Sequence, residues 1–111
     1  MSKSEQSNSE QLLLAMTQAA TQTASLLKTL GNPDRLLLLC QLTQGEACVS
    51  DLKASLGIVQ PTLSQQLTVL RNEGLVATRR EGKRIYYSIA DEKLFTLLNT
   101  LYQLYCPVKG N

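Results

Sequence analysis

The stretch PTLSQQLTVLRNEGLV (residues 61–76) decides the fold of this chain. Its buried-type positions Leu63, Leu67 and Leu70 are spaced by three or four residues, which predicts one apolar face of an α-helix. Pro61 lies in the predicted first turn, where proline is tolerated, and Gly74 ends the helix. The opposite face carries amides, hydroxyls and one arginine: Gln60, Thr62, Ser64, Gln65, Thr68 and Arg71.

A shorter helix is expected just before this stretch, over residues 51–56. Ser50 can cap its start, and Gly57 can end it. Two short helices joined by a tight turn, the second with a polar outer face, form a helix-turn-helix arrangement.

After the quoted stretch the pattern changes from helix to strand. Residues 75–80 and 84–90 read as two strands around the turn Glu81-Gly82-Lys83, which predicts a β-hairpin. Asp91 then begins a last helix with leucines on one side. That helix is expected to end at Cys106, because the residue before a proline is driven out of helical geometry.

Two more helices are expected before the helix-turn-helix. A long first helix carries a coiled-coil-like stripe and stops at Gly31, and Asn32 with Pro33 then begins a second helix over residues 34–44. The stripe consists of Leu12, Met16, Ala19, Thr23, Leu26 and Leu30. The predicted fold is mainly α with a small β-hairpin, in the order α-α-α-α-β-β-α. It forms one domain over residues 11–106, with a disordered tail at 1–10 and a C-terminal tail at 107–111.

Composition narrows the class of protein. Hydrophobic residues make up 43% of the 111 and charged residues 18%, as in ordinary globular proteins. No membrane-spanning stretch and no signal peptide are apparent, so a cytoplasmic location is expected. The chain has no histidine, which removes the commonest general base and the commonest metal ligand. We therefore expect no enzyme activity and no cofactor.

The charge distribution points to nucleic acid. Arg71, Arg79, Arg80, Lys83 and Arg84 lie close together in sequence with few acidic residues between them, which is typical of a nucleic-acid footprint. On the second helix of the motif, neutral amides and hydroxyls suit base edges, while the basic hairpin suits phosphates or the minor groove. The candidate DNA-binding residues are Gln60, Thr62, Ser64, Gln65, Gln66, Arg71, Arg79, Arg80, Lys83 and Arg84. The alternative interpretation is a solvated helix face followed by a solvated basic hairpin.

Three stretches together resemble a known family. LKTLGNPDRLLLLCQL, PTLSQQLTVLRNEGLV and TRREGKRIYYSI are similar to the ArsR/SmtB family of winged-helix repressors, over Leu27 to Cys106. The resemblance implies a homodimer built from the first and last helices, which binds an inverted-repeat operator in double-stranded DNA. It also implies release from DNA on a ligand or redox signal. One departure is Val59, where many members have a capping serine; Pro61 can supply part of that start signal.

The family's usual metal sites are not expected here. Many members bind metal through a Cys-x-Cys pair on the third helix or through histidine and acidic residues on the last. This chain has Cys48 followed by Ser50 at the second thiolate position, and it has no histidine.

Cys40 and Cys106 suggest a different signal. By periodicity alone Cys40 is a core cysteine in a leucine run and Cys106 a chance residue near the terminus. Their placement, however, is similar to the BigR/SqrR/HlyU group of reactive-sulfur and redox sensors. That resemblance implies that persulfide, polysulfide or oxidant joins the two thiols within one protomer and lowers DNA affinity.

Two alternatives stay open at this point. With Cys48, the two cysteines could form a three-thiolate site for arsenite or another soft ion. The other alternative is a thiol oxidoreductase or a simple interaction module. Catalysis is disfavoured because the chain has no Cys-x-x-Cys motif.

Overall fold

A computed structural model describes residues 2–106, with side chains from residue 8 onward. The chain divides into two compact units, one up to Gly31 and one from Asn32 on. The predicted C-terminal tail at 107–111 lies outside the described residues.

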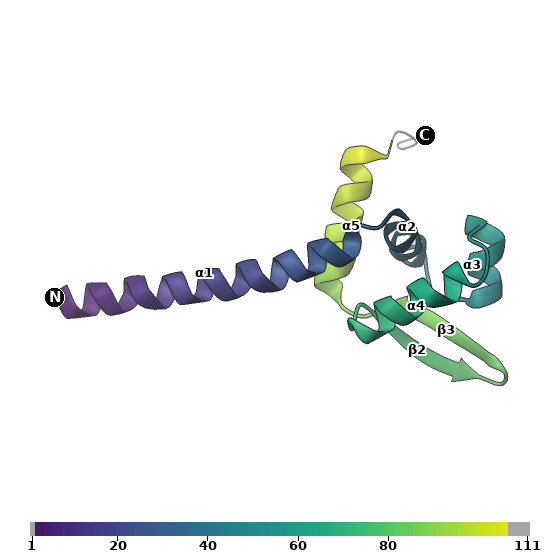
Figure 1. Ribbon diagram of the computed structural model, residues 1–111, viewed down its shortest axis with the longest axis horizontal. Coiled ribbons are helices and arrows are strands. Elements are labelled where there is room, and N and C mark those ends of the chain that lie inside the picture. The colour runs from purple at the N-terminus through teal and green to yellow at the C-terminus, as the bar shows by residue number, and fades with distance from the viewer. Residues whose placement is uncertain (1, 107–111) are drawn as a thin grey trace. The chain divides into compact units, whose positions relative to one another are not determined.

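The first unit is one continuous helix, α1 (Ser2–Leu30), drawn in purple to blue in Figure 1. The predicted apolar stripe lies on this helix, and its members Leu12 and Met16 are exposed by 61% and 59%. The helix already includes residues 2–10, so the disordered tail predicted there does not match the structure. Those residues are polar, but they contain no proline or glycine that would interrupt a helix.

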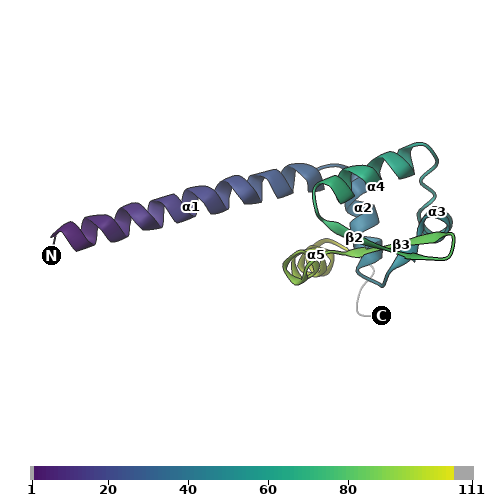
Figure 2. The same cartoon turned by 90° about the horizontal axis from the view of Figure 1, so that it is seen from below.

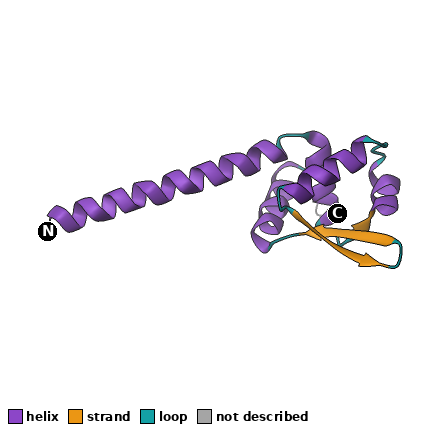
Figure 3. Ribbon diagram, turned by 60° about the horizontal axis from the view of Figure 1, so that its bottom comes forward, coloured by secondary structure: helices purple, strands orange, loops and turns teal. Residues whose placement is uncertain are grey.

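In the second unit, residues 32–106 form four helices and a small antiparallel sheet. The helices are α2 (Pro33–Leu42), α3 (Val49–Leu56), α4 (Thr62–Asn72) and α5 (Glu92–Tyr105). The strands β1 (Ala47–Cys48), β2 (Val76–Glu81) and β3 (Arg84–Ile89) pair in the order β1-β3-β2. Figure 3 shows the long hairpin of this sheet in orange beside the helices. The predicted element order is confirmed, with one strand added.

Caps explain where the helices begin. The Asn32 side-chain oxygen accepts from the Arg35 N–H at 3.0 Å, and that of Asp91 accepts from the Leu94 N–H at 2.7 Å, as the sequence predicted. The start of α3 differs from the prediction. Its N-cap residue is Cys48, whose backbone N–H donates to the Asp51 carboxylate at 3.2 Å, so Ser50 lies inside the helix.

The core of this unit is built from leucines. Seven are fully buried: Leu38, Leu39, Leu52, Leu63, Leu67, Leu70 and Leu98. Each contributes about 1.5–3 kcal/mol by leaving water. The helix α2 contacts α3, α4 and α5, and Figure 2 shows it running beneath α4. It is therefore the central element of the unit.

The hairpin turns at Gly82, whose φ of 63° lies in the left-handed region that favours glycine. Its pairing runs from Val76 opposite Ile89 to Glu81 opposite Arg84. The third strand, β1, places Ala47 opposite Tyr87 and Cys48 opposite Tyr86. A two-residue strand is too short to show an alternating pattern, so the sequence did not predict it.

Candidate functional site

The outer face of α4 carries the side chains predicted to read DNA. Ser64, Gln65, Thr68 and Arg71 are exposed, and Thr62 is half-buried. We call these five residues the DNA-reading face. The buried leucines hold this helix against the core, so the polar side chains point outward on a rigid support. Their contact with base edges stays a prediction.

Gln60, another predicted reader, has a local structural role. Its side-chain oxygen accepts a hydrogen bond from the Ser64 backbone N–H at 3.1 Å, which satisfies one free donor in the first turn of α4. Pro61, at the N-cap position, makes no capping hydrogen bond through its side chain. Gln60 therefore supplies a side-chain acceptor at the start of α4, where Val59 has none.

Gln66 differs from its neighbour Gln65. It is half-buried, and its side-chain oxygen accepts from Arg35 Nη1 at 3.0 Å. Arg35 was not among the candidate residues predicted from the sequence. The only signal for it was a cation at the start of an otherwise leucine-rich helix.

The wing is the hairpin β2–β3, and its four predicted DNA contacts have different surroundings. Arg79 forms ion pairs with Glu46 and Glu81 and lies over the Tyr86 ring, 4.6 Å from its centroid. These carboxylates raise the pKa of the Arg79 guanidinium. Arg80 is exposed and donates only a long hydrogen bond, 3.4 Å, to the Gly82 carbonyl. Arg80 is therefore more available to DNA than Arg79.

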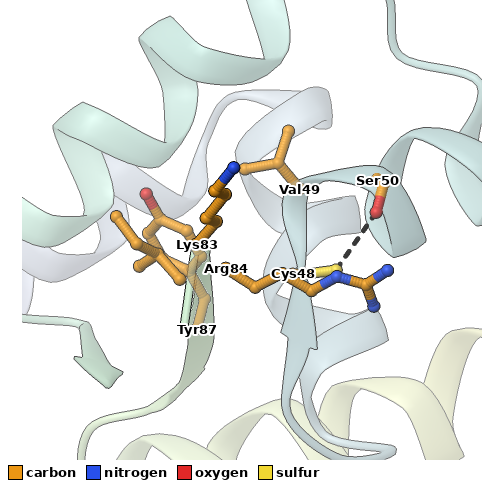
Figure 4. A pocket seen from close by; sticks show the side chains of 7 residues that line it. Cys48, Val49, Ser50, Lys83, Arg84 and Tyr87 are labelled. Carbon is orange, nitrogen blue, oxygen red and sulfur yellow. Dashed lines mark hydrogen bonds between the residues drawn. The ribbon is translucent and has the colours of Figure 1, made fainter. Parts of the chain in front are cut away.

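Lys83 and Arg84 lie beside the start of α3, around a cavity of about 280 Å³ (Figure 4). Cys48 and Ser50 line the same cavity, and the dashed line in Figure 4 joins their Sγ and Oγ atoms, 3.2 Å apart. The Cys48 thiol also donates to the Asp51 carboxylate at 3.2 Å. This hydrogen bond is the main cause that lowers the pKa of Asp51. Cys48 is thus a buried thiol held by polar partners.

Cys40 and Cys106 line a second cavity, of about 410 Å³, which we call the thiol cavity. Its other lining residues are apolar or aromatic: Leu36, Leu101, Tyr102 and Tyr105. Burial raises the pKa of the Cys40 thiol, and the nearby Cys106 raises it further. A hydrogen bond with Cys106 raises the pKa of Tyr102. The structure therefore brings together the two cysteines that the sequence singled out, from α2 and from the end of α5.

Cys48 is not among the residues that line the thiol cavity. Within residues 8–106, no group of three or more histidine, cysteine or acidic side chains is placed to hold a metal ion. The three-thiolate alternative therefore has no geometric support in this part of the chain. None of the helices formed by the described residues is long and apolar enough to cross a membrane.

Comparison with known proteins gives consistent matches. Residues 32–78 match the bacterial regulatory protein family named arsR. The chain is 52% identical over 99 residues to the biofilm growth-associated repressor of Agrobacterium fabrum, covering 89% of this chain and 85% of that protein.

Two solved structures share the fold. The crystal structure of the transcriptional repressor BigR from Xylella fastidiosa is 49% identical, covers 83% of this chain and 94% of its own, and has a TM-score of 0.77. A homodimeric winged helix-turn-helix DNA-binding domain from Mycobacterium bovis is 34% identical, with a TM-score of 0.66 over 86% of this chain and 91% of its own.

The fold and these matches define a winged helix-turn-helix regulator of transcription. The chain belongs to the ArsR family of bacterial regulatory proteins and is similar to the repressor BigR. The predicted family and fold are confirmed, and so is the prediction of a DNA-binding regulator instead of an enzyme.

Proposed function

We propose that this ArsR-family repressor binds its operator while Cys40 and Cys106 are reduced and releases it when they become bridged. One observation carries the proposal. The two cysteines are 66 positions apart (106 − 40) in sequence, one on α2 and one at the C-cap of α5, yet they line the same cavity. A bridge between them would pull α2 and the end of α5 together.

The surroundings of the two thiols assign them different roles. Burial holds the pKa of Cys40 above its ordinary range, so its nucleophilic thiolate is scarce at neutral pH. Cys106 is the C-cap residue of α5 and has the Tyr102 hydroxyl as a hydrogen-bond partner. We assign Cys106 as the first nucleophile and Cys40 as the resolving thiol.

The chemistry needs a sulfane sulfur donor such as inorganic polysulfide. The Cys106 thiolate attacks the terminal sulfane sulfur, forms a persulfide and expels a shortened polysulfide. The Cys40 thiol loses its proton, attacks the Cys106 sulfur and displaces hydrosulfide, which leaves a disulfide. The two thiols together lose two electrons, which reduce the sulfane sulfur to hydrosulfide. If a second sulfane sulfur enters first, the bridge is a polysulfide.

The functional unit in this proposal is a homodimer in the cytoplasm, where the genomic DNA is. In α1, Leu12, Leu13 and Met16 are exposed by 59–65%. In α5, Leu104 and Tyr105 are exposed by 68% and 78%. Large apolar side chains at helical spacing favour burial against a second copy. Sedimentation at micromolar concentration should show a dimer, and a monomer there would contradict this part.

Intact mass and operator binding, measured on the same sample, test the switch. The reduced protein should bind an inverted-repeat operator whose half-sites are about one helical turn apart. Polysulfide should then remove two hydrogens, or add whole sulfur atoms as well, and operator affinity should fall. Peptide mapping should locate the bridge at Cys40 and Cys106. Release without a mass change would overturn the proposal.

The raised pKa of Cys40 predicts a specific pH dependence. Since only the thiolate reacts, alkylation of Cys40 in a Cys48→Ser, Cys106→Ser variant should be slower at pH 7.5 than in the unfolded chain. Its rate should rise about tenfold per pH unit and keep rising above the pH at which a free thiol levels off. A rate equal to that of the unfolded chain across this range would contradict the effect of burial.

The metalloid alternative gives opposite results. A three-thiolate sensor would release DNA with arsenite, would ignore polysulfide and would lose its response in Cys48→Ser. The sulfur switch predicts that Cys48→Ser keeps its response. A thiol oxidoreductase would turn over a disulfide substrate and would have no operator to release.

A further inference from the structure

A hydrogen bond joins the helix that carries Cys40 to the recognition helix α4. Arg35 Nη1 of α2 donates to Gln66 Oε1 of α4 at 3.0 Å, across 31 positions of sequence. Both side chains are half-buried. A hydrogen bond with a charged donor that is partly shielded from water is among the stronger polar contacts in a protein.

Arg35 and Cys40 lie on different sides of the same helix. They are five positions apart, which is about 7.5 Å along the helix axis and about 140° around it. The helix α2 contacts α4 and α5, and Figure 2 shows it beneath α4. Cys40 lines the thiol cavity with residues of α5, while Arg35 reaches α4. A shift or rotation of α2 must therefore act on both contacts.

Gln66 is placed to control the orientation of the DNA-reading face. It directly follows Gln65, which is exposed, and successive side chains on a helix point about 100° apart. When Arg35 holds the Gln66 amide, the rotation of α4 about its own axis is restricted, and Gln65 keeps a fixed direction. The buried leucines alone fix this rotation less well, since apolar contacts have no direction.

We propose that Arg35 is a positioning residue that fixes the rotation of α4 through Gln66 and couples the thiol cavity to base recognition. Gln66 then anchors the recognition helix and does not itself read bases. We call the effect of Arg35 on the rotation of α4 the positioning half, and its link to the thiol cavity the coupling half. The coupling half rests on the thiol switch proposed above. The positioning half rests only on the hydrogen bond and on the family's DNA binding.

Two other roles for Arg35 make different predictions. If Arg35 only stabilises the fold, its loss lowers the melting temperature but leaves operator discrimination intact. If Arg35 contacts a DNA phosphate directly, its loss weakens binding to all sequences. It also reduces the slope of log DNA affinity against log salt concentration by about one unit. A positioning role reduces discrimination between operator and random DNA without a change in the salt dependence.

A double-mutant cycle separates these roles, with Arg35→Met, Gln66→Met and both together. Each single variant should lower the ratio of operator to random-DNA affinity about tenfold, and the double variant should lower it no further, since the Arg35–Gln66 hydrogen bond is lost in each case. Lys93→Met removes one exposed positive charge from α5 and should leave the ratio unchanged. Additive losses in the double variant would overturn the positioning role.

Gln66→Glu separates the effect of losing the hydrogen bond from a general loss of folding. A carboxylate at this position can still accept from Arg35, so discrimination should be kept with Arg35 present and lost in combination with Arg35→Met. If Gln66→Glu with Arg35 present loses as much discrimination as Gln66→Met, the hydrogen bond is not what positions α4.

The coupling half is tested with polysulfide, by intact mass and operator affinity measured together. Arg35→Met should form the Cys40–Cys106 bridge to the same extent as the parent protein, but its operator affinity should change much less. An unchanged response in Arg35→Met would overturn the coupling. If the parent protein forms the bridge and keeps its operator, the thiol switch and the coupling both fail, while the double-mutant cycle still decides the positioning role.

Discussion

The thiol cavity and the DNA-reading face of this ArsR-family regulator differ in the chemistry of their side chains. The thiol cavity is lined by apolar and aromatic side chains from α2 and α5 together with the thiols of Cys40 and Cys106. The DNA-reading face consists of amide, hydroxyl and guanidinium groups on α4, all exposed except the half-buried Thr62. The two regions share no residue, but α2 contacts both α4 and α5. Sensing and binding should therefore be separable by substitution, although they are linked by one helix.

The largest effect is expected in the thiol cavity. Cys40→Ser and Cys106→Ser should each abolish the loss of operator affinity caused by polysulfide, a change of about 5–150-fold if the coupling is typical of allosteric proteins. Their affinity for DNA before treatment should stay within about twofold of the parent, because neither thiol lies on the reading face.

Cys48→Ser is the matched control for these variants. Its thiol lines the cavity beside the wing and not the thiol cavity, so the polysulfide response should be kept. A response that survives in Cys40→Ser would show that the two regions are not linked through this cysteine pair.

Substitutions on the DNA-reading face should weaken operator binding and leave the polysulfide response unchanged. Gln65→Ala should cost about 1–3 kcal/mol on the cognate operator and little on random DNA, because a bidentate contact to a base edge is lost. The relative response to polysulfide should be unchanged. Gln44→Ala removes an exposed amide from the loop after α2 and serves as the control. Equal losses on operator and random DNA would mean that Gln65 contacts the backbone.

The wing should give a smaller effect, visible mainly in the salt dependence. Arg80→Ala and Arg84→Ala should each reduce the slope of log affinity against log salt by about one unit. Arg79→Ala should change it less, since Arg79 is already paired with Glu46 and Glu81. If the slope falls most in Arg79→Ala, DNA must displace these carboxylates, and the intrachain pairs do not decide which arginine binds.

The smallest effect concerns Cys48 and acid stability. The hydrogen bond from Cys48 lowers the pKa of Asp51, so its stabilisation is present above the ordinary pKa of aspartate and is lost as the pH falls through the lowered value. Cys48→Ala removes the side-chain donor, and its stability deficit should be larger at pH 7 than at pH 2. Cys48→Ser keeps a donor, so chemical denaturation should show a deficit with less dependence on pH. A deficit in Cys48→Ala that is the same at both pH values would contradict the role of this hydrogen bond.

The sequence predicted the elements with a strong local signal. The leucine spacing of α4, the caps Asn32 and Asp91, and the hairpin around Gly82 are all found in the structure. It missed features that depend on distant partners or very short segments. The strand β1 needs β3 as its partner, and the Arg35–Gln66 hydrogen bond joins residues 31 positions apart. Likewise, the sequence singled out Cys40 and Cys106, but only the packing of α2 against α5 brings them to one cavity.

The strand β1 has a consequence for operator choice. Its pairing with β3 at Tyr86 and Tyr87 ties the middle of the wing to the residue that begins α3, whereas the turn at Gly82 lies beyond this third strand. The wing is therefore held at its middle by β1, and its tip at Gly82 extends beyond that support. We expect such a tip to follow the width of the minor groove more than the identity of single bases. DNA shape in the segments that flank each half-site, including narrow A-tracts, should then contribute to which operators are bound.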